Sequence, residues 1–275
     1  MIDPFRPIYH VLLVVVALAC GPSAPEGRTD ESPLPRIVSV GPELGRVLVE
    51  LGLGSRVVGV DSASHAIPEL AHAIDLGGRD ALSDELARRA RPNLVLVLAG
   101  ASAPEANFAR TIAAEQIPAY VLSPSDANEV IATVHRIGRL VGREQRAAVF
   151  AAGLTRQVSE IAILRDGRTR LSAAWVIGRD PLVVVGGSGL LHELLELAGA
   201  ENAFHTPGET RLDVTAAELS AREPDVVLSA PAFAIAVPGA ESVSVDPALA
   251  RLPVLDVPTR VRALYAALYP HRDVL

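Results

Sequence analysis

From Arg36 onward, runs of apolar residues alternate with segments whose apolar positions recur at helical spacing. The runs RIVSV (36–40) and PNLVLVLAG (92–100) are typical of buried strands. Between them, PELGRVLVELGLG (42–54) has apolar positions every three or four residues and ends at glycine, as an amphipathic helix does. Strands that alternate with helices predict mainly parallel sheets covered on both faces, an α/β fold.

A long helical stretch then interrupts the alternation. SDANEVIATVHRIGRLVG (125–142) predicts one helix, capped by Ser125 or Asp126, and residues 143–167 predict a second, about 30 Å long. Strands and helices resume after it, from RLSAAWVIG (170–178) to a closing helix at RVRALYAALY (260–269). We therefore expect an N-terminal α/β lobe at 35–124, a helical segment with the connecting helix at 125–167, and a C-terminal α/β lobe at 168–275.

Two stretches of the chain resemble each other at an offset of 132 residues. LSDELARRARPNLVL (82–96) matches VTAAELSAREPDVVL (214–228), so that Ser83 aligns with Thr215 and Pro92 with Pro224. Each proline ends a helix just before a strand. The match predicts two lobes of similar build, and chance similarity between two α/β units is the alternative.

The first 34 residues have the composition of a leader and a tether. The apolar core at 11–19 has about nine residues, fewer than the roughly 20 that a membrane-spanning helix needs, and fits a secretory signal. Ala19 precedes Cys20, and a segment rich in Pro, Gly and Ser follows. The pattern resembles a bacterial lipoprotein signal, which predicts a signal peptide at 1–19, a lipidated Cys20 and a tether at 20–34. An ordinary secretory signal or an incidental cysteine is the alternative.

The composition of the chain argues against some kinds of binding partner and some kinds of metal site. The formal net charge of −7 argues against a general affinity for nucleic acid or anionic membrane. Aromatic residues make up only 4%, so the cores must consist largely of Ala, Val and Leu. The single cysteine excludes an internal disulfide and a cysteine-based metal cluster.

The chain resembles a known family in the order and spacing of several motifs. They are PRIVSVGPELGRVLVELGLGSRVVGVD (35–61), DLGG (75–78), GRLVGREQRA (138–147) and DPLVVVGGSGLLHELLELAGAENAF (180–204). The chain resembles the periplasmic binding proteins of ABC importers that carry cobalamin, haem and ferric siderophores. The resemblance implies two Rossmann-like lobes joined by one rigid helix, a ligand between the lobes, and a permease as partner. It leads us to expect an extracytoplasmic, lipid-anchored solute-binding protein for an iron-siderophore-like or other anionic metal chelate. We expect a monomer with no catalytic site, no resident metal and no cofactor.

The loops that follow strands should carry the ligand contacts. Cobalamin-binding members hold their ligand with aromatic residues, but the matching positions carry none: Ala66, Arg79, Leu98, Ile177, Val183 and Arg211. Haem-binding members often have tyrosine at the position of Ala66. Arg79 and Arg211 are related by the same offset of 132, which predicts that they face each other across the cleft and bind an anion. The alternative is that both are solvated, or paired with Asp80 and Glu209.

Further candidate ligand contacts lie in the same set of loops. They are Glu43, Ser64, His65, Gly78, Asp180 and Ser188. His65 and His205 could instead approach across the cleft as a metal or haem site. The turn VVVGGSGLLHE (183–193) is either a tight turn before a helix or an anion contact through its backbone N–H groups. An envelope enzyme or scaffold that kept the fold without transport is the rival function.

The resemblance also implies that one surface glutamate of each lobe meets the permease. In the N-terminal lobe this residue is Glu85, seven residues before Pro92. In the C-terminal lobe the matching position is Ala217, and the next residue, Glu218, stands three after Thr215 at capping-box spacing. We therefore predict asymmetric docking, with Glu85 free and Glu218 occupied by its own helix end.

Overall fold

The computed structural model describes residues 35–100, 103–165 and 169–270. The predicted signal peptide, Cys20 and the tether lie outside the described residues. Residues Pro35–Leu275 form one compact unit.

The N-terminal lobe is a five-stranded parallel sheet in the order β3-β2-β1-β4-β5. Its strands are β1 (Ile37–Val40), β2 (Val57–Val60), β3 (Ile74–Asp75), β4 (Leu94–Leu98) and β5 (Ala119–Leu122). Its helices are α1 (Pro42–Glu50), α2 (Ser62–His65), α3 (Asp84–Ala90) and α4 (Pro104–Ala113). In β4, Leu94, Leu96 and Leu98 pack with α1, while Val95 and Val97 pack with α3 and α4. Both faces of β4 are therefore buried, which explains why this strand is apolar throughout.

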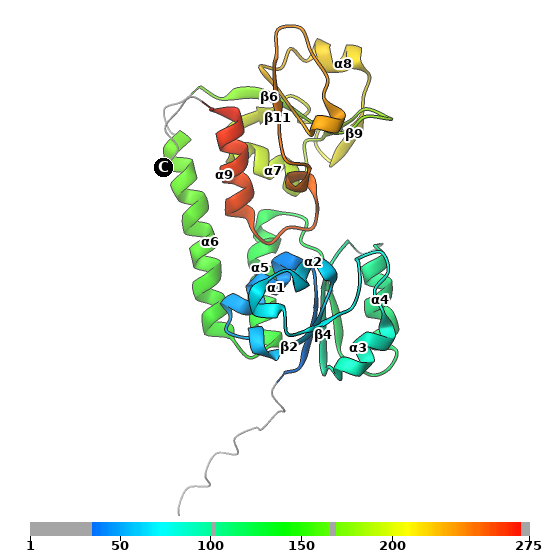
Figure 1. The fold of residues 1–275 in the computed structure, drawn as a ribbon. Coiled ribbons are helices and arrows are strands. Elements are labelled where there is room, and N and C mark those ends of the chain that lie inside the picture. The colour runs from blue at the N-terminus through cyan, green and yellow to red at the C-terminus, as the bar shows by residue number, and fades with distance from the viewer. Residues whose placement is uncertain (1–34, 101–102, 166–168, 271–275) are drawn as a thin grey trace, which may run out of the picture. The chain divides into compact units, whose positions relative to one another are not determined.

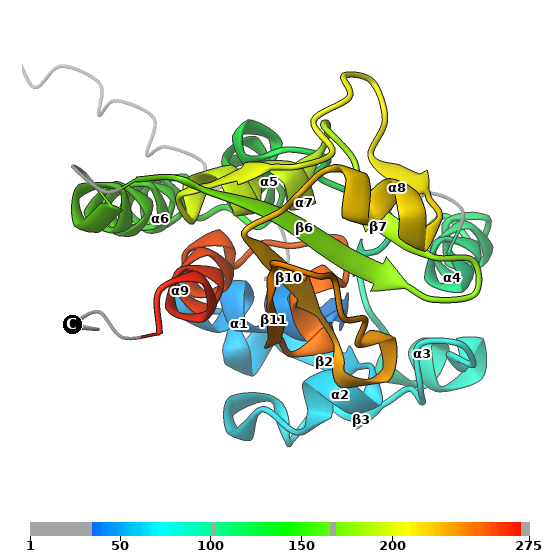
Figure 2. The same ribbon diagram turned by 90° about the horizontal axis from the view of Figure 1, so that it is seen from above.

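The C-terminal lobe has a mixed sheet in the order β11-β10-β6-β7-β9, with β8 paired to β6. The strands are β6 (Leu171–Gly178), β7 (Val183–Val185), β8 (Ala200–Asn202), β9 (Arg211–Asp213), β10 (Val226–Ser229) and β11 (Glu241–Ser244). Figure 2 shows β6 crossing the lobe with β10 and β11 beside it. β7 runs antiparallel to both β6 and β9. The α/β fold with mainly parallel sheets is confirmed, since β6, β8, β10 and β11 pair in parallel. The antiparallel pairing of β7 follows from its short connection, because residues 179–182 are too few for a crossover from β6 to β7.

Two helices link the lobes. α5 (Ala127–Leu140) begins at Asp126, whose side chain accepts a hydrogen bond from the Glu129 N–H at 2.8 Å. α6 (Glu144–Arg165) is the predicted connecting helix, and Figure 1 shows it beside α9 (Val257–Leu268). Gly138 lets α5 and α6 approach closely, because a Cβ there would lie 2.4 Å from the Cβ of Ala147.

The predicted similarity of the lobes is present in detail. Ser83 caps α3, and Thr215 caps α8 (Ala216–Ala221). The residues before the two matching prolines, Arg91 and Glu223, both have left-handed backbone, with φ of 51° and 47°. β4 and β10 follow these turns and occupy matching positions in their sheets.

One apolar core runs through both lobes. It includes Leu96 of β4, Ile137 of α5, Leu154 of α6, Trp175 of β6 and Leu264 of α9, all buried. Trp175 is only 1% exposed, as expected of a core residue. Because this packing is continuous, the lobes are held together by more than the connecting helix.

Candidate ligand-binding site

A cavity of about 520 Å³ lies between the lobes. From the N-terminal lobe it is lined by Gly100, after β4, and by residues 123–125, after β5. From the C-terminal lobe it is lined by Ile177 of β6, the start of α7 (Leu190–Leu197) and the start of β9. Small-ligand sites commonly measure about 300–1,000 Å³, so the cavity has the size of one.

The lining combines apolar surface with one cation and several hydroxyls. Its apolar side chains include Ile177, Leu190 and Leu252, and Leu252 leaves 48% of its surface exposed. The hydroxyl residues are Ser123, Ser125, Ser188 and Thr210. Arg211 is the single charged residue among the described lining residues. Such a surface suits an apolar ligand that carries an anionic group.

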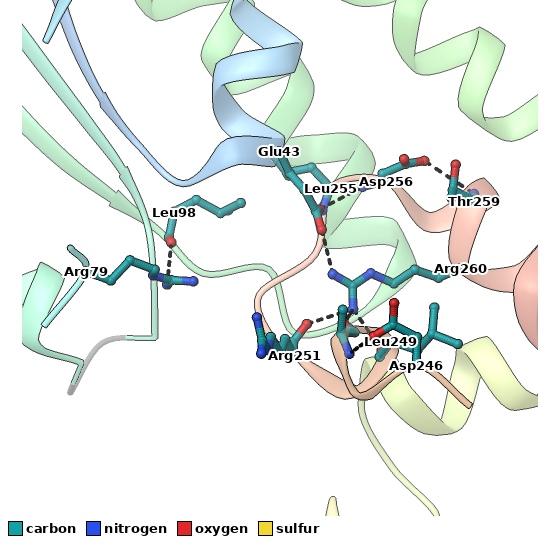
Figure 3. Close-up of polar contacts among 11 residues, drawn as sticks. Glu43, Arg79, Leu98, Asp246, Leu249, Arg251, Leu255, Asp256, Thr259 and Arg260 are labelled. Carbon is teal, nitrogen blue, oxygen red and sulfur yellow. Dashed lines mark hydrogen bonds and ion pairs between the residues drawn. The ribbon is translucent and has the colours of Figure 1, made fainter. Parts of the chain in front are cut away.

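The two predicted arginines have different surroundings. Arg211 lines the cavity, is exposed, and has no hydrogen bond or ion pair with any other described side chain, Glu209 included. Arg79 is absent from the described lining and is ion-paired with the buried Glu105 of α4. Its Nη2 also lies 3.4 Å from the carbonyl oxygen of Leu98 (Figure 3). The partner of Arg79 is therefore Glu105 rather than Asp80, and Arg79 is held against its own lobe.

Glu43, which is also a predicted ligand contact, joins the lobes. It lies in the first turn of α1, and its Oε1 accepts a hydrogen bond from Nη2 of Arg260 on α9 at 2.5 Å. Its Oε2 accepts from the backbone N–H groups of Leu255, at 2.5 Å, and Asp256, at 3.1 Å (Figure 3). Both carboxylate oxygens are thus occupied by the start of the helix that closes the C-terminal lobe.

A second glutamate makes the reciprocal contact. Glu193, in the first turn of α7, accepts a hydrogen bond from the Ala127 N–H at the start of α5, at 2.8 Å. A carboxylate at a helix N-terminus satisfies free N–H groups and complements the helix dipole. One glutamate of each lobe therefore binds backbone N–H groups where a helix of another part of the chain begins, α5 for Glu193 and α9 for Glu43.

Ser64 is buried rather than directed to the ligand. Its side chain is hydrogen-bonded to Oδ1 of Asp61, a fully buried residue that also accepts from the Gly41 N–H at 3.0 Å. These contacts fix the turn after β2 against the start of α1. The Ser64 hydroxyl is therefore already hydrogen-bonded inside the lobe, and a ligand contact by Ser64 stays a prediction.

The remaining predicted contacts are not brought together. His65, Gly78 and Asp180 lie outside the described lining of the cavity. His205 is exposed, and its Nδ1 lies 3.1 Å from the carbonyl oxygen of Asn202. Among the described residues, no group of three or more His, Cys, Asp or Glu side chains is placed to hold a metal ion.

The turn after β7 serves as a platform for the loop that carries Arg211. A Cβ on Gly186 would lie 2.4 Å from the carbonyl oxygen of Glu209, and one on Gly187 would lie 2.2 Å from the carbonyl carbon of His205. Ser188 lines the cavity, and its Oγ accepts a hydrogen bond from the Gly208 N–H at 2.8 Å. The two glycines are thus explained by close packing, and Ser188 contributes to the same support.

The two glutamates predicted for docking differ as expected. Glu85 is exposed in the first turn of α3. Glu218 forms a complete capping box with Thr215, accepting from its N–H at 2.7 Å and its hydroxyl at 2.8 Å. The hydrogen bond from the Thr215 backbone, followed by that from its side chain, holds the pKa of the Glu218 carboxyl below its ordinary value. The capping role predicted for Glu218 is confirmed.

Sequence reasoning missed two parts of the lining. Ser123 and Ser125 directly follow β5, so the rule that ligands bind at the carboxyl ends of strands could have found them. The segment with Ala250, Leu252 and Pro253 gave no such signal. Arg260 holds that segment by donating to the carbonyl oxygens of Ala248, Leu249 and Arg251 at 2.6–2.9 Å.

Comparison with known proteins identifies the fold and the family. The chain is similar to an ABC transporter substrate-binding protein from Listeria monocytogenes, with a TM-score of 0.73 at 19% identity over 86% of this chain and 99% of the other. A periplasmic heme-binding protein, BhuT, in complex with two hemes gives a TM-score of 0.70 at 21% identity over 86% and 98%. The vitamin B12 binding protein BtuF of Vibrio cholerae gives 0.67 at 14% identity over 86% and 98%.

No curated protein matches the sequence. A family model described as periplasmic binding protein matches residues 37–254, which include most of both lobes and the helices between them. The family consists of solute-binding proteins that are not enzymes. The chain belongs to the periplasmic binding protein family.

Proposed function

We infer that this protein captures an anionic metal chelate of the siderophore type between its lobes and delivers it to an ABC importer permease. The observation that carries the proposal is the cavity lined by Arg211, four hydroxyl residues and apolar side chains. A guanidinium with no partner among the described residues can donate several hydrogen bonds to a carboxylate or another anionic oxygen. The apolar walls would cover the organic part of the chelate.

Haem, cobalamin and a bare metal ion are the other ligand classes of the same fold. Ala66, Leu98, Ile177 and Val183 offer no aromatic ring for a flat macrocycle, and Ala66 offers no phenolate to haem iron. For a bare ion, the described residues supply no cluster of ligating side chains. A chelate bound through its anionic periphery requires neither feature.

In this proposal the protein binds its ligand outside the cytoplasm. Cys20 would carry the lipid anchor, so that the binding unit stays at the periplasmic or outer face of a membrane. Glu85 would meet the permease from the N-terminal lobe. The C-terminal contact would need another residue, because Glu218 is occupied by Thr215.

Native mass spectrometry of protein purified from its own source tests this proposal directly. We expect a co-purifying adduct with the mass of an iron chelate and its visible absorbance. Adding ferric citrate, ferric hydroxamate, haemin and cyanocobalamin separately to stripped protein should show binding of a ferric chelate only. Binding of haemin or cyanocobalamin alone, or turnover of an added substrate, would overturn the proposal.

A further inference from the structure

A second, smaller cavity lies in the C-terminal lobe beside the main one. It measures about 180 Å³ and is formed at the carboxyl ends of β6, β10 and β11. It shares Ile177 and Ala250 with the cavity between the lobes. A ligand that fills the main cavity could therefore extend a side group into the smaller one, which we call the side compartment.

The side compartment has the size and lining of a site for one ring. Its apolar lining includes Trp175, Phe233 and Pro247, and Phe233 is only half-buried. An apolar cavity of about 150 Å³ accommodates a benzene molecule, so the compartment is large enough for a six-membered ring. Aromatic side chains favour offset or edge-to-face contact with such a ring.

Arg251 adds a cation to this apolar lining. Its side chain is exposed and makes no hydrogen bond or ion pair with other described residues. Asp246 also lines the compartment, but its Oδ1 accepts from the Ala248 N–H at 2.8 Å and caps the short helix Pro247–Ala250. No ion pair joins Asp246 to Arg251 in the described structure, so the guanidinium is available to an incoming anion.

The backbone of Arg251 is hydrogen-bonded, although its side chain has no hydrogen bond or ion pair with the described residues. Its carbonyl oxygen accepts a hydrogen bond from Nη1 of the buried Arg260 at 2.9 Å, and Nη2 of Arg260 is bound to Glu43 (Figure 3). The Arg251 guanidinium thus extends from a backbone segment that Arg260 holds by hydrogen bonds. A donor on an ordered backbone loses less conformational freedom when it binds.

We propose that the side compartment binds an aryl carboxylate group of the ligand, with the ring packed near Trp175 and Phe233 and the carboxylate on Arg251. This deepens the proposed function and rests on it for the ligand as a whole. It also assigns a second cation, Arg251, to the binding surface in addition to Arg211. Within the described lining of the two cavities, these are the two arginines.

The single tryptophan makes the proposal testable without the natural ligand. The indole N–H of Trp175 gives one resonance in a nitrogen–proton correlation spectrum of the purified full chain. Benzoate should shift this resonance in a saturable way, with a Kd of about 1–10 mM for a fragment of its size. Benzamide, which has the same shape without the charge, should bind about tenfold more weakly.

Two variants separate the cation from general charge effects. Arg251→Gln should weaken benzoate binding about tenfold and leave benzamide binding unchanged. Arg262→Gln removes an exposed charge of α9 that lines neither cavity, and it should leave the binding of benzoate and benzamide unchanged.

No movement of the Trp175 resonance with benzoate, or equal effects of the two variants, would overturn the proposal. A ferric chelate that binds without moving the Trp175 resonance would refute the side compartment alone. A benzoate shift without binding of any chelate would support the compartment and refute the proposed function.

Discussion

Glu43→Ala should destabilise the protein by removing a polar contact between the lobes. The side chains of Glu43 and Arg260 are only 16% and 11% exposed, so the variant leaves a guanidinium and two backbone N–H groups without their acceptor. Removing one partner of a fully buried ion pair costs about 3–5 kcal/mol. Because this pair keeps some contact with water, we expect about 2–4 kcal/mol.

Thermal unfolding measures this loss. For a chain of this size, 1 kcal/mol lowers the melting temperature by about 2–4 °C, so we expect a fall of roughly 4–16 °C. Glu50→Ala is the matched control, since Glu50 is exposed at the other end of the same helix, and it should change stability by less than about 0.5 kcal/mol.

A double-mutant cycle isolates the pair from other effects of each substitution. Arg260→Met also removes the donors to three carbonyl groups, so the single variant alone cannot identify the contact with Glu43. In combination with Glu43→Ala we expect a coupling energy of about 1–3 kcal/mol. A coupling near zero, or a Glu43→Ala variant as stable as Glu50→Ala, would refute the assignment of this contact as one that stabilises the association of the lobes.

Three further predictions concern the surface and the leader. Thr215→Ala should cost about 1 kcal/mol in urea unfolding and raise the pKa of Glu218 only part of the way to its ordinary value, because the Thr215 N–H still donates to the carboxylate. Because folding lowers that pKa, the contribution of the Glu218 carboxylate is present at neutral pH and fades as the pH falls below 4.5; identical acid unfolding curves for Glu218→Gln and wild type would contradict this. Glu85→Ala should reduce permease capture in a pull-down with unchanged ligand affinity, and normal capture would exclude Glu85 from docking. Cys20→Ser should release the protein from membranes in a fractionation assay, whereas a mature N-terminus without an acyl chain in wild type would contradict the anchor.

The fold could be predicted from the sequence where a local pattern determines the structure. The helix caps at Ser83 and Thr215, the prolines that follow, and the apolar β4 strand all depend on residues near in the chain. The antiparallel β7 was missed because PLVVV has the composition of a strand in either direction. Loop length, rather than strand composition, determines how it pairs.

The site could be predicted only in part, because its polar side chains form hydrogen bonds and ion pairs with residues that are distant in the chain. Arg211, which the family resemblance and the repeat offset both pointed to, lines the cavity, but its counterpart Arg79 pairs with Glu105, which is 26 residues away. Glu43 reaches Arg260 across 217 residues, and that contact also positions the segment carrying Arg251. No local sequence pattern predicts such contacts. The sequence therefore suggested a ligand role for Glu43 and gave no sign that this residue joins the lobes.

Calorimetric titration of a ferric chelate against wild type and Arg211→Gln tests the central claim most directly. The account predicts that the variant binds about tenfold or more weakly, and that wild-type affinity falls as salt is raised. Arg79→Gln should have a smaller effect on affinity, because Arg79 is already ion-paired with Glu105. Equal affinity of wild type and Arg211→Gln at low salt would contradict an anionic ligand held in the cavity between the lobes.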